Sequence, residues 1–157
     1  MAQAPFGCHS RALGRYPPGV SGDPSIEALD DGVRRLADRL RSLGAPRLGR
    51  APRLPAVGGE ADARSVADRA HALAGELVAL DVGSARRSDP TQPAVSVVPR
   101  LSDFAVGDQV AVCGASCLAA VRGVPLETLV WWGGQRLPLG PLLARLTQRA
   151  RDLRLAV

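Results

Sequence analysis

Apolar residues between positions 26 and 43 recur at alternating spacings of three and four. The series consists of Ile26, Leu29, Val33, Leu36, Leu40 and Leu43. Because an α-helix turns once every 3.6 residues, such a series forms a narrow seam along one side of a helix. Asp23 before Pro24 is a suitable N-cap, and Gly44 is a suitable terminating residue. The pattern therefore predicts a helix over 24–43 with its apolar side packed on another helix.

A second apolar series with the same spacing follows in the next part of the chain. It comprises Ala63, Val66, Ala70, Leu73, Leu77 and Leu80 and predicts a helix over 60–82 that ends at Gly83. Two matching seams favour packing of one on the other. Residues 44–59 form a long Pro-rich linker, which lets the seams meet parallel, antiparallel or across two chains.

The second half of the chain predicts shorter elements. Residues 84–101 form a second linker, in which the β-branched run at 95–98 predicts one short strand. Residues 103–122 fit a helix better than a strand, because Gly107 interrupts the strand pattern. Both readings stay open at this point.

Prolines mark the start of the last two predicted helices. Pro125 can open a short helix through Leu129 and Val130, which the pair Gly133 and Gly134 ends. Pro141 opens a helix over 141–154. Its apolar residues are again spaced by three and four: Leu143, Leu146, Ala150, Leu153 and, just beyond, Val157.

The amino-acid composition favours a helical core. Only five of the 157 residues are aromatic, so the core has to be built from Leu, Val and Ala side chains, which pack well between helices. We predict an all-α protein with a single domain over 23–157, built as a bundle of four to five helices. Residues 1–22 mix Gly, Pro, Ser and Arg without periodicity and are predicted to form a disordered tail.

Cysteine usage and hydropathy bear on the location of the protein. Three cysteines cannot all pair within one chain, which favours a reducing compartment. The first 22 residues lack the apolar run of a signal peptide. The longest nearly apolar stretch, 110–121, is shorter than the roughly 18 residues that span a bilayer. We therefore expect a cytoplasmic protein and no membrane partner.

The positive charge is carried entirely by arginine. The chain has 20 basic residues, all arginines, against 15 acidic residues, for a net charge of +5. The linker segment 45–59 holds three arginines and no acid. The last predicted helix carries four candidate phosphate-binding residues: Arg145, Arg149, Arg151 and Arg154. Such a helix can bind nucleic acid, although a solvated helix face has the same pattern.

Residues with reactive side chains are few and scattered. Cys113 and Cys117 share a helical face, and Cys8 with His9 could complete a zinc site. The spacings differ from those of C-x2-C zinc motifs, which favours packing of the cysteines in the core. His71 has no nucleophile signature beside it and is interpreted as a surface histidine. We expect no catalytic residue, metal ion or cofactor.

One short motif matches an enzyme. Gly133-Gly134-Gln135 is the tripeptide with which translation release factors hydrolyse peptidyl-tRNA. It lies between Trp132 and Leu137 rather than in a long basic loop. We therefore interpret it as a chance match, since a motif needs its structural context.

Two segments carry a resemblance to known proteins. Residues 103–112 (DFAVGDQVAV) resemble a segment of small uncharacterised actinobacterial proteins, and residues 36–43 (LADRLRSL) are similar in character. The two segments cover under a fifth of the chain. The resemblance implies a bacterial helical protein and no particular activity.

The function that we expect follows from the narrow width of the apolar seams. An apolar face limited to a seam is typical of two-helix or intersubunit packing. We expect a non-enzymatic helical module for protein–protein interaction or self-association, with the 26–43 series as its interaction seam. The alternative is a nucleic-acid-binding regulator that uses the Arg-rich C-terminal helix.

Overall fold

The computed structural model describes residues 23–51 and 64–157. Helices account for 64% of these residues. They are α1 (Pro24–Arg41), α2 (Ala45–Leu48), α3 (Val66–Ala85), the short 3₁₀ helix η1 (Asp103–Ala105), α4 (Val106–Val121) and α5 (Leu139–Ala156). A two-stranded sheet joins β1 (Leu129–Trp132) to β2 (Gln135–Pro138). The fold is therefore mostly helical, as predicted, but it is not strictly all-α.

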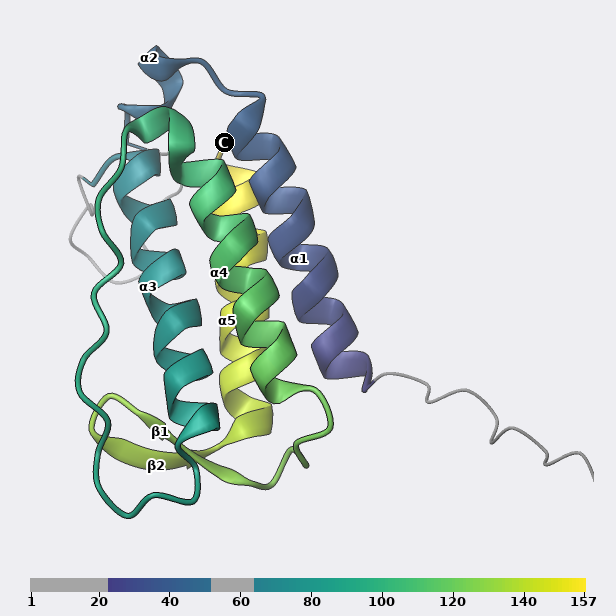
Figure 1. Cartoon of the computed structure of the whole chain (residues 1–157). Helices are drawn as coiled ribbons and strands as arrows, with labels where there is room; N and C mark the ends of the chain where they lie inside the picture. Colours follow the sequence, from purple (N-terminus) through teal and green to yellow (C-terminus); the bar gives the residue numbers. More distant parts are fainter. Residues whose placement is uncertain (1–22, 52–63) are drawn as a thin grey trace, which may run out of the picture.

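Four long helices form a bundle (Figure 1). α1 and α5 run in one direction, while α3 and α4 run in the opposite direction. α1 packs mainly on α4 and α5, and α3 packs mainly on the same two helices and on β1. The two seam-bearing helices α1 and α3 therefore occupy opposite corners of the bundle. The expected packing of one seam on the other is wrong, because α4 and α5 lie between them.

Capping residues set the starts of the first two long helices. The Asp23 carboxylate accepts a hydrogen bond of 2.8 Å from the Ser25 N–H, and Pro24 opens α1 as predicted. α3 begins at Val66 instead of residue 60, because Ser65 and Asp68 form a reciprocal capping box. α3 also continues past Gly83 to Ala85. Gly83 is needed for packing, since a Cβ there would lie 2.0 Å from the Trp131 carbonyl oxygen.

The predicted short helix after Pro125 is wrong, because this segment leads into the β-hairpin. Leu129 pairs with Pro138 and Trp132 pairs with Gln135, which leaves a two-residue turn. Its residues Gly133 and Gly134 have φ angles of 56° and 84°. Positive φ at both central positions is the requirement of a type I′ turn, which suits the twist of a hairpin. The Gly-Gly pair is thus a hairpin turn rather than a helix stop.

Both predicted linkers differ from expectation. Residues 45–48 form the short helix α2, whose Leu48 is buried, while 52–59 lie outside the described residues. Residues 86–102, here called the crossover, return along the outside of α3 to the start of α4 (Figure 1). The strand predicted at 95–98 is absent from the crossover, and Val95 and Val97 are exposed. The predicted tail, 1–22, also lies outside the described residues.

The helical reading of 103–122 is confirmed, as η1 followed by α4. α5 begins at Leu139, two residues before Pro141, where the Leu139 N–H donates to the Thr128 carbonyl over 3.0 Å. One apolar core runs through all four long helices, and Leu29, Leu36, Leu77 and Leu143 are completely buried in it.

Candidate functional site

The predicted interaction seam on α1 points into the bundle. Its six members are buried: Ile26, Leu29, Val33, Leu36, Leu40 and Leu43. Their neighbours belong to α4 and α5 of the same chain. The structure thus brings the six residues together as core, and Leu43, the last of them, also lines a pocket. A binding surface has to be sought elsewhere.

The four candidate phosphate-binding arginines on α5 do not form one basic face. Arg149 forms an ion pair with Glu76 of α3. The guanidinium carbon of Arg145 lies 5.9 Å from the centre of the Trp132 ring, within the range of a cation–π contact. Both arginines are therefore engaged within the chain.

The other two arginines of α5 lie apart from this pair. Arg151 follows Arg149 by two residues, which turns it roughly half a turn around the helix. It is exposed and lines a pocket of about 400 Å³ together with Pro24 and Ser25 at the start of α1. Arg154 is half-buried. No continuous basic stripe results on this helix.

The cysteines pack in the bundle, as their helical spacing predicts. Cys117 is buried, and this burial, with a smaller effect of Asp81, raises its thiol pKa to about 12. Burial likewise raises the pKa of the half-buried Cys113 thiol. Both thiols are protonated at neutral pH and are poor nucleophiles and metal ligands. Cys8 and His9 lie outside the described residues.

Other residues with reactive or metal-binding side chains are dispersed. Within 23–51 and 64–157, no three residues of the types His, Cys, Asp or Glu gather closely enough to hold a metal ion. His71 is half-buried on α3, and its Nδ1 atom has no hydrogen-bond partner among the described residues. The interpretation of His71 as a surface histidine is therefore only partly right.

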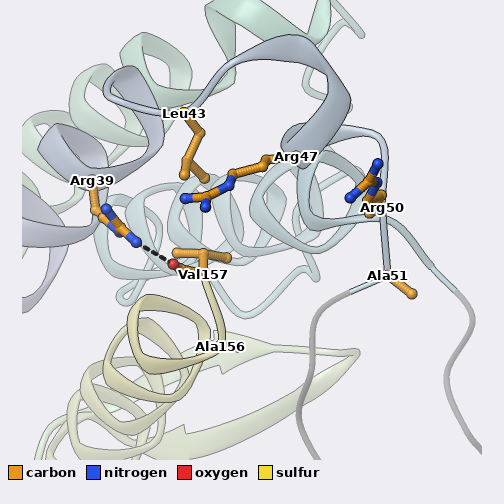
Figure 2. A pocket seen from close by; sticks show the side chains of 7 residues that line it. All are labelled: Arg39, Leu43, Arg47, Arg50, Ala51, Ala156 and Val157. Atoms are coloured by element: carbon orange, nitrogen blue, oxygen red, sulfur yellow. Dashed lines mark hydrogen bonds between the residues drawn. The ribbon is translucent and has the colours of Figure 1, made fainter.

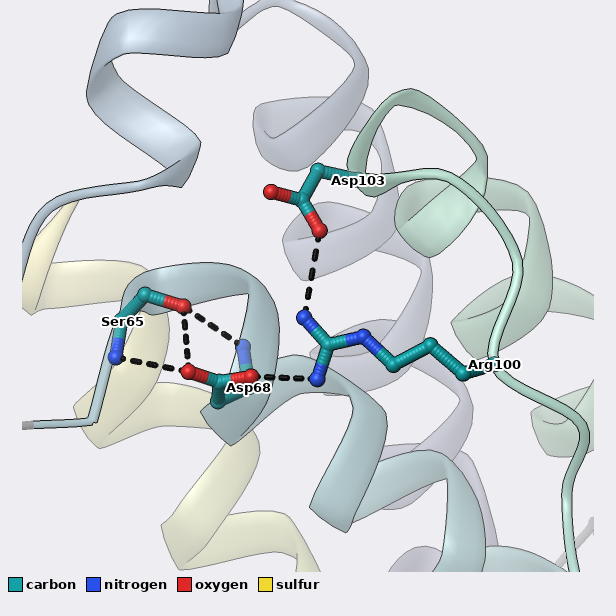
Figure 3. A network of polar contacts seen from close by, with 4 residues as sticks. All are labelled: Ser65, Asp68, Arg100 and Asp103. Carbon is teal, nitrogen blue, oxygen red and sulfur yellow. Dashed lines mark hydrogen bonds and ion pairs between the residues drawn. The ribbon is translucent and has the colours of Figure 1, made fainter.

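A polar cluster fastens the end of the crossover to the bundle (Figure 3). Arg100 forms ion pairs with Asp68 of α3 and, over 3.2 Å, with Asp103 of η1. Hydrogen bonds from Ser65 and Arg100 lower the pKa of the Asp68 carboxyl to about 2. Gln109 of α4 adds a hydrogen bond of 2.7 Å to the Pro99 carbonyl. The last part of the crossover is thereby held beside both α3 and α4.

The fastened crossover and α4 display most of the exposed apolar side chains. Among the described residues seven large apolar side chains are exposed, and five of them lie between positions 95 and 112. We call these five the apolar surface: Val95, Val97, Leu101, Phe104 and Val112. Their exposed fractions range from 52% to 86%. Exposed apolar side chains are candidates for contacts with another protein where several of them share one face.

The outer side of α4 continues the apolar surface. Residues spaced by three or four from Phe104 lie on this side and are all exposed: Asp108, Val112, Ala115 and Ala119. The only charged side chain of this stripe, Asp108, accepts a hydrogen bond of 2.7 Å from Arg41 of α1. This pairing leaves the middle of the stripe without an unpaired charge.

The same helix has the length and composition of a membrane span. Residues Asp103–Val121 form the one such stretch in the described part of the chain. In this structure α4 packs on α1 and α3, and 44% of the stretch is buried. The core helix of a folded bundle meets the same criteria, so the finding is weak evidence for insertion.

Sequence reasoning missed the apolar surface for an identifiable reason. It assigned the 95–98 run to a strand and did not consider Phe104 and Val112 as exposed residues of the 103–122 helix. The signal was the stretch 110–121, in which apolar or small side chains lie around the whole circumference of the helix, which is unusual for a helix on a bundle exterior.

Comparisons with protein-family models, with curated proteins and with solved structures found no match for this chain. The resemblance to small actinobacterial proteins therefore stays a prediction.

Proposed function

We propose that this protein is a non-enzymatic helical module that associates with a second copy of itself through the apolar surface. The observation that carries the proposal is the concentration of five of the seven exposed large apolar side chains in residues 95–112. Burial of such side chains is the main favourable contribution to association. The proposed interface thus differs from the seam predicted on 26–43, whose residues pack inside the bundle.

The stripe on α4 suits a symmetric pairing. In a two-fold dimer the same surface is used by both subunits. If two α4 helices pair antiparallel about the middle of the stripe, Phe104 faces Ala119 of the second copy. Val112 then lies next to its own counterpart. A large residue opposes a small one at each end, and small residues such as Ala115 allow the helices to approach closely.

The nucleic-acid alternative has less support. Binding of a phosphate backbone draws on several arginines that face one way. Here Arg145 and Arg149 are engaged with Trp132 and Glu76, and Arg151 is turned away from them. We propose no catalytic activity for a separate reason: both thiols are protonated, and the His, Asp and Glu residues described above are dispersed.

Sedimentation velocity tests the proposal. The wild-type protein is measured from about 1 to 100 µM beside Val112→Asp, which places a charge in the centre of the proposed interface. Leu155→Asp is the matched control, because Leu155 is an equally exposed apolar residue on a helix outside the apolar surface. We expect a mass that rises with concentration for the wild type and the control, and a monomer for Val112→Asp. A wild-type monomer throughout this range contradicts the proposal.

A further inference from the structure

A pocket of about 280 Å³ lies at the end of the bundle opposite the hairpin (Figure 2). Three arginines line it: Arg39 of α1, Arg47 of α2, and Arg50 just after α2. Its apolar lining comes from Leu43 and, at the end of α5, from Ala156 and Val157. The pocket is separate from the apolar surface and has no part in the function proposed above.

The backbone around the pocket is held in place by contacts with the core. The buried Leu48 side chain anchors α2 on the bundle. The Arg50 carbonyl accepts a hydrogen bond of 2.8 Å from the N–H of Val66, at the start of α3. Arg39 donates a hydrogen bond to the Val157 carbonyl oxygen and so points across the pocket. The backbone positions of the three arginines are therefore fixed, although their side chains are exposed.

The three arginines of the pocket have no acidic side chain as a partner among the described residues. No Asp or Glu is among the described residues that line the pocket. Neither Arg47 nor Arg50 forms a side-chain hydrogen bond or ion pair within 23–51 and 64–157. Other arginines of α1 do have acidic partners: Arg34 and Arg35 contact Asp31, and Arg41 contacts Asp38 and Asp108. Arg47 and Arg50 are thus available to an anion from outside, and Arg39 keeps N–H donors besides the one that it gives to Val157.

We propose that this pocket binds a small molecule that carries a phosphate monoester. Figure 2 shows the guanidinium groups of Arg39 and Arg47 converging above Val157, with Arg50 farther to one side. A phosphate monoester carries about −1.5 to −2 charges at pH 7, which two guanidinium groups match. Its oxygens suit the planar donor geometry of arginine.

The size and lining of the pocket indicate how large and how apolar the organic part of the ligand is. The volume of about 280 Å³ is slightly smaller than the roughly 300 to 1,000 Å³ of typical small-molecule sites, so only a small ligand fits. The Leu43, Ala156 and Val157 side chains offer an apolar wall to the organic group that bears the phosphate. A concave site of this size accommodates a single small ligand better than the continuous backbone of a nucleic acid, which runs along an extended groove or stripe.

Isothermal titration calorimetry with phenyl phosphate as the probe tests the site. Inorganic phosphate serves as a probe without an organic group, and a short single-stranded oligonucleotide tests the polymer alternative. We expect one phenyl phosphate per chain, bound more tightly than inorganic phosphate because its ring contacts the apolar wall. We also expect affinity to fall below pH 6, where the phosphate loses its second charge.

Single substitutions locate the binding. Arg47→Gln and Arg39→Gln should each weaken phenyl phosphate binding about tenfold or more, since each removes a charge-assisted hydrogen-bond donor. Arg122→Gln is the control, because it removes the same charge from an exposed position at the C-terminal end of α4. Circular dichroism of each variant verifies the fold. The proposal is overturned if phenyl phosphate does not saturate, if the control weakens binding equally, or if only the oligonucleotide binds.

Discussion

Gly114 of α4 lies directly against Val33 of α1, so that a Cβ atom at position 114 would come within 2.4 Å of the Val33 Cγ1 atom. The stiff, β-branched Val33 side chain cannot move away without changing rotamer. Gly114→Ala should therefore destabilise the protein by about 1 to 3 kcal/mol, although alanine favours helices over glycine. Urea unfolding measures the change.

Gly75 provides the matched control for this substitution. It lies in the interior of α3, and no atom is within 4 Å of the position that a Cβ would take. Gly75→Ala should raise the free energy of unfolding by about 0.5 to 1 kcal/mol through helix propensity. Equal effects of the two substitutions would show that α1 and α4 do not approach as closely as described.

The seam on α1 belongs to the core, so truncating one of its side chains should lower the free energy of unfolding strongly. Leu36 is completely buried, whereas the adjacent Arg35 forms only an exposed ion pair with Asp31. Leu36→Ala should lower the free energy of unfolding by about 2 to 5 kcal/mol, and Arg35→Ala by no more than about 0.5. Thermal melts of both variants check this, and similar melting temperatures for the two would place Leu36 outside the core.

Asp68 should make stability depend on pH in an acidic window. Its folded pKa of about 2 lies below the ordinary value of 3.8, so its contribution is present above pH 4. That contribution is lost as the pH falls from about 4 to 2, where the folded carboxylate takes up a proton. In urea unfolding at several pH values, Asp68→Asn should lose less stability across this window than the wild type.

Asp152→Asn is the control for the pH experiment. Asp152 is exposed near the end of α5 and accepts a hydrogen bond of 2.7 Å from Gln148. This variant still has Asp68 with its partners Ser65 and Arg100, so the part of the acid dependence that Asp68 causes should stay as in the wild type. If Asp68→Asn also keeps it, then Ser65 and Arg100 do not hold the carboxylate in solution as they do in the structure.

Local sequence signals predicted α1 and its inner face well, although the helix ends at Arg41 rather than at residue 43. The N-cap of Asp23 and the three-four spacing from Ile26 to Leu43 predicted α1 and its buried side, since both depend on residues within a few turns of each other. The role of Gly83 depends on a distant partner. Sequence reasoning interpreted it as a helix stop, whereas α3 continues to Ala85 and the glycine makes room for the Trp131 backbone.

The binding surfaces depend even more on the tertiary fold. The narrow seam predicted an interface, but the sequence does not say whether the partner helix belongs to the same chain. The charge of 45–59 was evident from Arg47 and Arg50, whereas the pocket also needs Arg39 and Val157, which the bundle brings together. Similarly, Phe104 and Val112 are exposed together only because the opposite side of α4 packs on α1 and α3.

The proposed pairing of two α4 helices is tested most directly by mixing two charge variants. Val112→Asp and Val112→Arg should each be monomeric, because residue 112 of one copy lies next to residue 112 of the other and like charges repel. An equimolar mixture should recover a dimer in sedimentation velocity, since the opposite charges then meet across the two-fold axis. If the mixture remains monomeric while the wild type is a dimer, the chain associates through a different surface. If the single variants are themselves dimeric, Val112 does not lie in the interface.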